Sequence, residues 1–332
     1  MNYFIYKEVG TKSIQEGCFP QNARVINEEN FSITQYENYI RIDIYLGDSL
    51  SKGFQVVPCL SINSSSSYGY QATIKYNVNN KNHDVSISPI GEYIENYKRE
   101  SSSSHVSSEI DLFITKKPIE NVTLSFKVTG ISISELEKNY SLVSISIFDN
   151  FQKESSQSLD NEIELDVPRK SQMLFEPEIR RRICSPTSIS MVQEYYGRKS
   201  DVIAIANRAY NKIHDMYGIW PQNIWAMLGN GLSGYVSKLS NFEDVVYFLN
   251  NNIPLIASIN YGEGELTNAA IEKTPGHLVV IIGMTKEHVI VNDPAANSLS
   301  SVRRLYDIHE FKKAWLDKKG IVYIIYPYGK EK

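Results

Sequence analysis

The stretch Arg181-Arg182-Ile183-Cys184-Ser185-Pro186-Thr187-Ser188 decides how the second half of this chain is interpreted. Because a proline is tolerated only in the first turn of a helix, Pro186 predicts a helix that begins close to Cys184. The residues up to Gly197 have apolar side chains at helical spacing and end on that glycine. The amino end of a helix carries free N–H groups and a partial positive charge, which lower the pKa of a thiol. Cys184 is therefore a candidate nucleophile, although most lone cysteines are small buried apolar residues.

Two polar residues downstream strengthen this interpretation. His277 begins the apolar run 278–283, and Asp293 ends the next run, 288–292. The two runs predict a hairpin with its turn centred on Thr285, which would place His277 and Asp293 opposite or nearly opposite each other, with Cβ atoms ~5 Å apart. An aspartate there can orient an imidazole and stabilise its charged form. The alternative is a polar pair at the open end of a hairpin, in which the aspartate makes a local turn.

Gln172, upstream of Cys184, is a candidate for the remaining part of an acyl-transfer site. Its side-chain amide, together with the backbone N–H of Cys184, can bind the oxygen of a tetrahedral intermediate. Taken alone, a glutamine in a loop carries little information.

Aromatic residues between 217 and 225 include two of the three tryptophans, Trp220 and Trp225. The functional interpretation is a groove wall that binds substrate side chains, and the alternative is core packing of an aromatic-rich helix. The segment 262–276, which leads into His277, is interpreted either as a mobile loop that gates the groove or as a plain solvated loop.

The composition is that of a globular protein with more than one domain: 332 residues, 42% hydrophobic and 22% charged. A net charge of −4 and the lack of a dense basic block argue against a nucleic-acid binder. The other two cysteines, Cys18 and Cys59, form no disulfide framework; one bridge between them is conceivable, but two free thiols are favoured. No Cys-x-x-Cys or His-x-x-x-His spacing and no Gly-rich phosphate loop occurs, so neither a metal nor a cofactor is expected.

The sequence also bears on location. No apolar stretch reaches the ~18 residues of a membrane span. Residues 1–8 lack the charged start, apolar core and cleavage site of a signal peptide. These features predict a cytoplasmic protein without a membrane span, or an extracellular one if a leader has been removed.

The first part of the chain, residues 1–165, alternates apolar and polar side chains with period two. Clear examples are 40–46, 70–76, 122–128 and 141–148. About eight such runs without a convincing helix predict an antiparallel, jelly-roll-like β-sandwich. We interpret this region as an accessory or binding domain, whose ligand would be carbohydrate or protein.

The second part, residues 166–332, has helical patterns first and strand patterns afterwards, which is typical of an α+β domain. Helices are predicted at 189–197 as part of the Cys184 helix, 202–212, 221–228 and 242–250, and strands at 255–260, 278–283, 288–292 and 321–326.

The motifs of this second part resemble the bacteriocin-processing, double-glycine-leader cysteine peptidases and their stand-alone relatives. The similar segments are Val167-Pro168 with Gln172, Cys184 with Pro186-Thr187-Ser188, Met191 and Tyr195-Tyr196-Gly197, Gly276-His277-Leu278-Val279-Val280, and Val291-Asn292-Asp293-Pro294.

The resemblance covers about residues 165–327 and implies a papain-like fold. It also implies roles for four residues: Cys184 as nucleophile, His277 as base, Asp293 as its orienter and Gln172 in the oxyanion hole. The family usually has glycine where this chain has Ser185, which predicts a tighter or differently oriented turn at the cysteine. No transporter segment is present, so leader processing during export is not implied.

The leading hypothesis is a cysteine hydrolase, most simply a peptidase. The thiolate of Cys184 would attack a peptide or other amide carbonyl, protonated His277 would assist the leaving amine, and water would resolve the thioester. One alternative is amidase or transamidase chemistry on the same scaffold, which product analysis with amine acceptors would distinguish. Another is a binding protein, in which a β-sandwich is fused to a catalytically idle peptidase-like domain.

Overall fold

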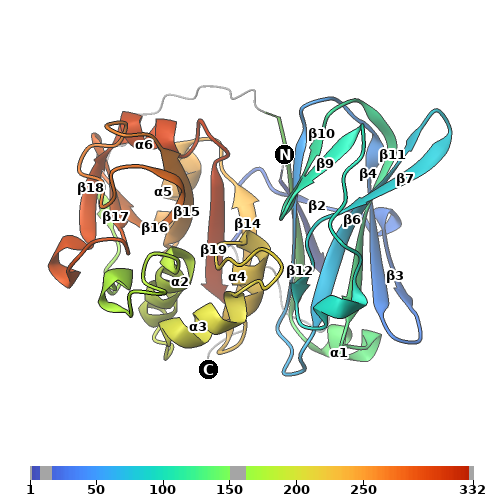
Figure 1. The fold of residues 1–332 in the computed structure, drawn as a ribbon, viewed down its shortest axis with the longest axis horizontal. Coiled ribbons are helices and arrows are strands. Elements are labelled where there is room, and N and C mark those ends of the chain that lie inside the picture. The colour runs from blue at the N-terminus through green and yellow to red at the C-terminus, as the bar shows by residue number, and fades with distance from the viewer. Residues whose placement is uncertain (1, 8–16, 150–161, 329–332) are drawn as a thin grey trace. The chain divides into compact units, whose positions relative to one another are not determined.

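The computed structural model describes residues 2–7, 17–149 and 162–328 (Figure 1). The chain divides into two compact units. The first unit consists of Met1–Ile14 and Asn22–Asn150, and the second of Gln15–Gln21 and Phe151–Lys332.

The first unit is built from two β-sheets, and the chain crosses from one sheet to the other several times. One sheet has the order β2 (Arg24–Val25), β1 (Asn2–Lys7), β12 (Ser141–Phe148), β5 (Gln55–Ile62), β10 (Leu112–Thr115) and β9 (Val106–Glu109). The other has the order β3 (Phe31–Gln35), β4 (Ile40–Leu50), β11 (Ile119–Thr129), β6 (Gly69–Val78) and β7 (Lys81–Ser86), with β8 (Ile90–Gly91) beside β6. All described pairings are antiparallel except the parallel pair of β1 and β2.

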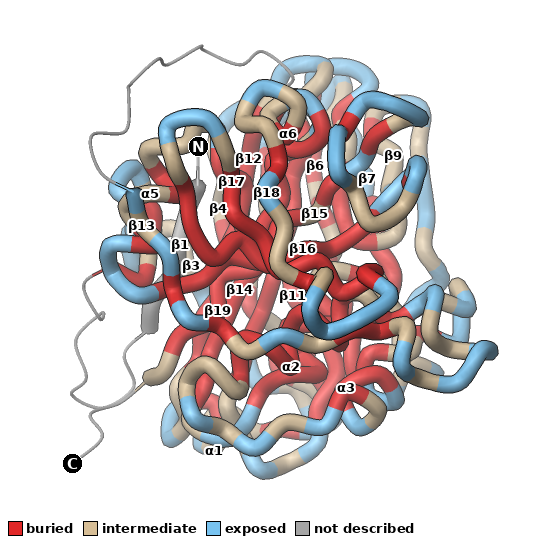
Figure 2. Tube along the Cα trace, turned by 90° about the vertical axis from the view of Figure 1, so that its left-hand side faces the viewer, coloured by how far each residue is buried: buried red, intermediate tan, exposed pale blue. Residues whose placement is uncertain are grey.

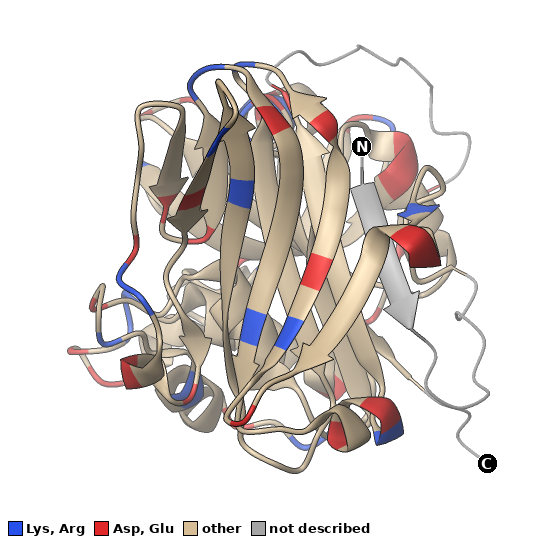
Figure 3. Cartoon of the chain, turned by 90° about the vertical axis from the view of Figure 1, so that its right-hand side faces the viewer, with Lys and Arg blue, Asp and Glu red and all other residues tan. Residues whose placement is uncertain are grey.

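Buried and more exposed side chains alternate along strands such as β4, which gives such a strand one apolar and one polar face. Along β4, Ile40, Ile42 and Ile44 are buried, whereas Arg41 and Asp43 lie on the other face and form an ion pair of 2.7 Å. Across the strands of this sheet, Figure 3 shows scattered basic and acidic residues of both signs, with no patch of one sign. One face of the sheet therefore supplies core, and the other is polar.

Side chains of β6 and of the residue just before it, Tyr68, reach from the second sheet to the first. The Tyr70 and Tyr68 hydroxyls accept hydrogen bonds from the backbone N–H groups of Leu60 and Ile62 in β5, at 3.2 and 3.0 Å. Both acceptors are buried, so these bonds satisfy polar groups inside the unit. A short helix that the sequence pattern did not predict, α1 (Ile133–Lys138), precedes β12 and begins with a capping box.

The second unit contains an antiparallel sheet and five helices. The sheet order is β14 (Leu232–Lys238), β19 (Ile321–Pro327), β15 (Leu255–Tyr261), β16 (Thr274–Met284), β17 (His288–Asn292) and β18 (Arg303–Asp307), with β13 (Ile163–Glu164) beside β16. The helices are α2 (Cys184–Tyr195), α3 (Val202–Ala209), α4 (Trp220–Met227), α5 (Phe242–Asn250) and α6 (Ile308–Ala314). Helix α2 packs against β16, which is buried from His277 to Met284 (Figure 2).

The predicted helix over 202–212 ends early, at Ala209. The side chain of Asn211 accepts hydrogen bonds from the N–H groups of Ile213 and His214, at 2.9 and 3.1 Å. Such a local bond competes with helix continuation, so the chain turns instead. The sequence pattern also missed β14, β18 and α6, whereas the predicted range 242–250 matches α5.

A short segment from the start of the chain completes the second unit. The Tyr235 hydroxyl of β14 donates to the carbonyl of Cys18 at 2.7 Å, and the Phe19 ring stacks on Tyr235 with centroids 5.3 Å apart. Cys18 is buried there. The core of this unit therefore includes residues far upstream of its main stretch.

Within the described ranges, no helix has the length and apolar character needed to cross a membrane.

Candidate active site

Cys184 is the first residue of α2, as Pro186 predicted. The preceding residue, Ile183, gives no side-chain cap, so the first-turn N–H groups are not occupied by one. Ser185 continues the helix, and its buried hydroxyl donates to the Tyr323 hydroxyl at 3.1 Å. The expectation of a tighter turn at Ser185 is therefore wrong: the serine fits a regular first turn.

The hairpin that carries His277 and Asp293 forms, but its predicted register is wrong. Val280 pairs with Asn292, and continuing this register would place His277 opposite Ala295 rather than Asp293. Two features cause the difference: the turn is closed by the Thr285 N–H bonding to the His288 carbonyl, and a register shift interrupts β16. Asp293 lies just beyond β17 and meets His277 diagonally, which is within reach of these side chains.

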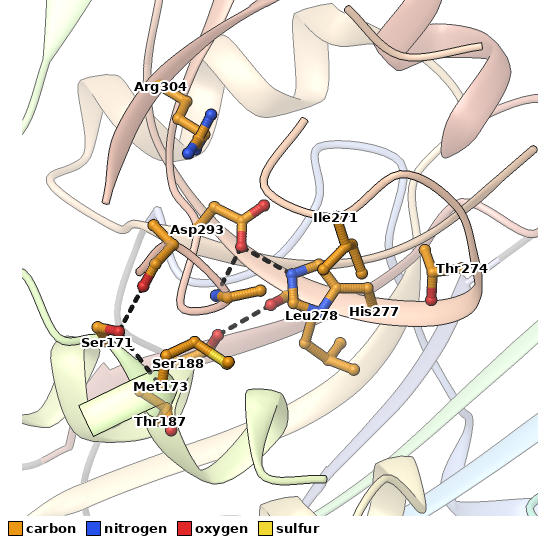
Figure 4. Close-up of polar contacts among 12 residues, drawn as sticks. Ser171, Met173, Thr187, Ser188, Ile271, Thr274, His277, Leu278, Asp293 and Arg304 are labelled. Carbon is orange, nitrogen blue, oxygen red and sulfur yellow. Dashed lines mark hydrogen bonds and ion pairs between the residues drawn. The ribbon is translucent and has the colours of Figure 1, made fainter. Parts of the chain in front are cut away.

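The His277 and Asp293 side chains are in direct contact. Nε2 of His277 and Oδ1 of Asp293 are 2.8 Å apart, and the two side chains are 3% and 0% exposed (Figure 4). The N–H of Ala295 also donates to Oδ1, at 2.8 Å. Because Nε2 is used by the carboxylate, Nδ1 is the ring nitrogen that remains for the thiol.

The sequence pattern gave no sign of a fourth polar member, Tyr306. Its hydroxyl donates to Oδ2 of Asp293 at 2.6 Å. Tyr306 lies in β18, whose residues Arg303–Asp307 show no apolar alternation. No local signal could have revealed this contact, because it depends on how β18 pairs with β17.

The His277 ring lies close enough to the Cys184 thiol for each group to shift the pKa of the other. Burial alone would raise the pKa of Cys184, but the His277 hydrogen bond and charge, with backbone hydrogen bonds of Leu278 and Ser185, hold that pKa below its ordinary value. Burial would lower the pKa of His277, but the Asp293 carboxylate and the contact with Cys184 raise it to about 10. Both shifts favour a thiolate–imidazolium pair near neutral pH.

A second contact fixes the start of α2 beside His277. The Ser188 hydroxyl, one helical turn after Cys184, donates to the carbonyl of Leu278 at 3.2 Å (Figure 4). Ser188 is buried, so the bond is protected from water. This bond ties helix α2, which carries the thiol, to strand β16, which carries the imidazole.

Gln172 lies next to the segment that carries Asp293. It is the first residue of a 3-10 turn, Gln172–Leu174, and its N–H donates to the carbonyl of Pro294 at 2.8 Å. The Asn292 side chain donates to the carbonyl of Val167 at 3.0 Å and holds the approach to Gln172. Gln172 is 4% exposed, and among the described residues its side-chain oxygen has no hydrogen-bond partner.

The two predicted substrate-binding tryptophans have different surroundings. Trp225 is 4% exposed, and the Arg208 guanidinium lies 4.8 Å from its ring centroid. This burial corresponds to the core-packing alternative and corrects the groove-wall interpretation of Trp225. Trp220, at the start of α4, is half-buried, with the Lys319 ammonium 5.7 Å from its ring centroid.

The segment before His277 is fastened to the rest of the unit. The N–H of Thr267 donates to Glu310 at 2.6 Å, and Arg304 donates to the carbonyl of Asn268 at 2.7 Å. The loop is therefore anchored to β18 and α6, and the structure gives no support to free mobility.

The three cysteines are free thiols, so the conceivable Cys18–Cys59 bridge does not form. Cys18 and Cys59 are buried, and only Cys184 is partly exposed. In the described part of the chain, no group of three or more His, Cys, Asp or Glu residues could hold a metal ion.

Comparison with known proteins finds a family match within the second unit. Residues 164–322 match the family described as peptidase C39-like. A structure described as a C39-like peptidase from Bacillus anthracis matches with 20% identity and a TM-score of 0.40, covering 52% of this chain and 100% of that one. The peptidase domain of Streptococcus ComA, described as a bifunctional ABC transporter involved in quorum sensing, matches with 16% identity and a TM-score of 0.35, covering 46% of this chain and 96% of that one. No curated protein matches the chain.

The family match confirms the resemblance drawn from the sequence motifs. Because it begins close to β13 and ends within β19, it covers the helix of Cys184 and the hairpin of His277. The similarity to the peptidase C39-like family extends over residues 164–322, which lie within the second unit.

Proposed function

We propose that this protein is a cysteine peptidase that cleaves a peptide or other amide bond through a thioester. The observation that carries the proposal is the grouping of Cys184, at the start of α2, with a buried His277 that is hydrogen-bonded to Asp293 at 2.8 Å. A peptide or protein is accordingly the proposed substrate.

The proposed reaction has two steps. The Cys184 thiolate attacks the carbonyl carbon, and the N–H of Cys184 and the Gln172 amide bind the resulting oxyanion. Protonated His277 gives its proton to the leaving amine as the C–N bond breaks, which leaves a thioester on sulfur. Water then attacks the thioester, with neutral His277 accepting the proton, and the acid product leaves.

The surroundings of the four residues support these roles. Asp293 is fully buried and bonded to Nε2, so it orients Nδ1 toward the thiol and stabilises the charged ring. The N–H2 group of Gln172, and not its side-chain oxygen, would donate to the oxyanion, and the residue is buried beside the segment that carries Asp293. Trp220 is the tryptophan that keeps accessible surface for substrate.

The test is selective alkylation of the full chain with iodoacetamide near neutral pH, followed by peptide mapping. Cys184 should react well before Cys18 and Cys59, and Cys184→Ala should abolish both this labelling and the cleavage of a mixed peptide library read by mass spectrometry. Equal, slow labelling of all accessible thiols would overturn the proposal. Adding an amine acceptor separates the chemistries, because a transamidase yields new amide products whereas a peptidase yields acids.

We also propose that the strands β1 to β12 of the first unit form a jelly-roll-like β-sandwich, which acts as an accessory domain to the peptidase domain of the second unit. The strand orders β1-β12-β5-β10 and β4-β11-β6-β7 support this, because the chain crosses repeatedly from one sheet to the other, as in jelly-roll folds. The tyrosine bonds between β6 and β5 also support it. A carbohydrate or protein ligand for this domain stays a prediction.

A further inference from the structure

We propose that Tyr306 is a positioning residue of the candidate site: its hydroxyl keeps the Asp293 carboxylate ionised and turned toward His277. This inference rests on the proposed peptidase function. It adds a member that comes from β18, outside the hairpin that carries His277.

The hydrogen bonds of Asp293 divide between its two oxygens. Oδ1 receives the His277 ring and the N–H of Ala295, both at 2.8 Å. Oδ2 receives, among the described residues, one donor: the Tyr306 hydroxyl at 2.6 Å. Both Asp293 and Tyr306 are 0% exposed, so bulk water does not reach Oδ2 to replace the tyrosine as donor.

The direction of this bond follows from the charges. Burial, and then the neighbouring Asp293 charge, raise the pKa of Tyr306 above its ordinary value, so the phenol stays protonated. Burial would raise the pKa of Asp293, but His277 and the Tyr306 hydrogen bond hold it below its ordinary value. An ionised carboxylate only accepts, so the phenol donates.

The Tyr306 ring is fixed by the sheet and by α6. Tyr306 pairs with Val289 of β17. Its ring stacks on Phe311 of α6, with centroids 6.0 Å apart and an interplanar angle of 21°. A hydroxyl held in this way cannot follow the carboxylate if Asp293 rotates. The short bond therefore selects one orientation of Asp293, the one in which Oδ1 faces His277.

Tyr261 provides a matched control for the loss of a buried hydroxyl. It is 2% exposed and lies close enough to Tyr306 and Asp293 to affect and be affected by their charges. Its hydroxyl, however, donates to the carbonyl of Ile271 at 3.0 Å and not to Asp293. Tyr261→Phe thus removes a similar group from the same region without removing a donor to the carboxylate.

The experiment compares Tyr306→Phe, Tyr261→Phe and the unmodified full chain in two assays: peptide hydrolysis, and the pH dependence of Cys184 alkylation. Tyr306→Phe should lower kcat/KM roughly 10- to 100-fold, mainly through kcat, because a charge-assisted hydrogen bond is lost. Without the O–H donor, the site loses partial positive charge, and the pKa values of Asp293 and of the Cys184 thiol should rise. The low-pH side of the alkylation profile, where the thiolate forms, should therefore move about one unit to higher pH. Tyr261→Phe should move neither quantity.

A second arm tests whether Tyr306 acts through Asp293. In an Asp293→Ala background, Tyr306→Phe should have little further effect on hydrolysis, because there is no carboxylate left to orient. Equal effects of the two tyrosine variants, or an undiminished effect of Tyr306→Phe without Asp293, would overturn the inference. Failure of selective Cys184 alkylation in the unmodified protein would instead overturn the proposed function.

If Tyr306→Phe does not fold, 3-fluorotyrosine at position 306 replaces it. This residue keeps the ring and the hydroxyl, and its more acidic phenol is a stronger donor. The acidic limb should then move to lower pH, and an unchanged limb would count against the inference.

Discussion

The two units each hold a thiol next to a hydrogen-bonding ring, with opposite consequences. In the first unit, Cys59 of β5 is fully buried and bonded to the hydroxyl of Tyr70, whose pKa is raised well above its ordinary value by burial and by Cys59. In the second unit, Cys184 is partly exposed at the start of α2 and bonded to His277, and its pKa is lowered. A neutral partner keeps a thiol inert, whereas a chargeable ring with its own carboxylate activates it.

The same contrast extends to other polar groups of the first unit. Several of its partly buried pairs are neutral, such as Tyr76 with Ser103 at 2.7 Å and Tyr97 with Thr129 at 2.5 Å, although Asp43 pairs with Lys75 at 3.0 Å. The second unit instead brings ionisable groups together at one place, which is the pattern of functional sites. The predictions below test whether the charge partner is what separates the units.

Removing His277 should give the largest effect and make Cys184 resemble the inert thiols. In His277→Ala, burial would dominate, as it does for Cys18, whose pKa it raises to about 12. Hydrolysis should fall by roughly 10³-fold or more, because the general acid and base is lost. Cys184 alkylation at neutral pH should drop toward the rate of Cys18, as measured by peptide mapping.

His288→Ala is the control for this variant. His288 starts β17 at the turn end of the hairpin and should tolerate the change with normal labelling of Cys184. Rapid labelling of Cys184 in His277→Ala would show that the helix start alone activates the thiol.

The pH dependence should be the next largest effect. The pKa of His277 is raised from 6.5 to about 10, so the charged ring contributes stability fully below pH 6.5 and loses it as the pH rises through about 10. Hydrolysis, which needs the imidazolium, should decline over the same range, while alkylation of the thiolate persists. In Asp293→Asn the alkaline limb should move down toward 6.5, and an unmoved limb would exclude Asp293 as the cause of the raised pKa.

Local pattern was enough to predict much of both units. Alternation predicted β4, and apolar spacing predicted α5, because each element buries one face that the residue order reveals. The position of Pro186 located the start of α2 in the same way.

Features that depend on tertiary contacts were missed. A register shift within β16 is invisible to residue counting, so His277 and Asp293 meet diagonally and not as an opposed pair. Tyr306 became visible only once β18 had paired with β17. Trp225 is buried beside Arg208, whereas its aromatic character alone suited a groove equally well.

A smaller effect should come from the upstream segment that completes the second unit. Phe19→Ala removes the stack on Tyr235, and we expect the second unit to lose about 1–2 kcal/mol of unfolding free energy. Hydrogen exchange should become faster in β14 and β19 but not in β4 and β11. Phe19→Leu, which keeps apolar volume, should show a smaller change, and equal loosening of both units would contradict this assignment.

The smallest effect should come from the buried pair next to the nucleophile, Ser185 and Tyr323. Although it lies beside Cys184, this pair is neutral like Tyr76 with Ser103, so it should contribute to stability and not to reactivity. Ser185→Ala and Tyr323→Phe should each cost ~1 kcal/mol by removing one buried hydrogen bond. The double variant should cost less than the sum, because both single changes remove the same bond, and this is measured by a denaturant-unfolding cycle. Hydrolysis should change little in all three variants, since the backbone N–H of Ser185 is retained. A large loss of hydrolysis in Tyr323→Phe would mean that neutral buried partners also tune the Cys184 thiol. The contrast between the two units would then rest on the helix start rather than on His277.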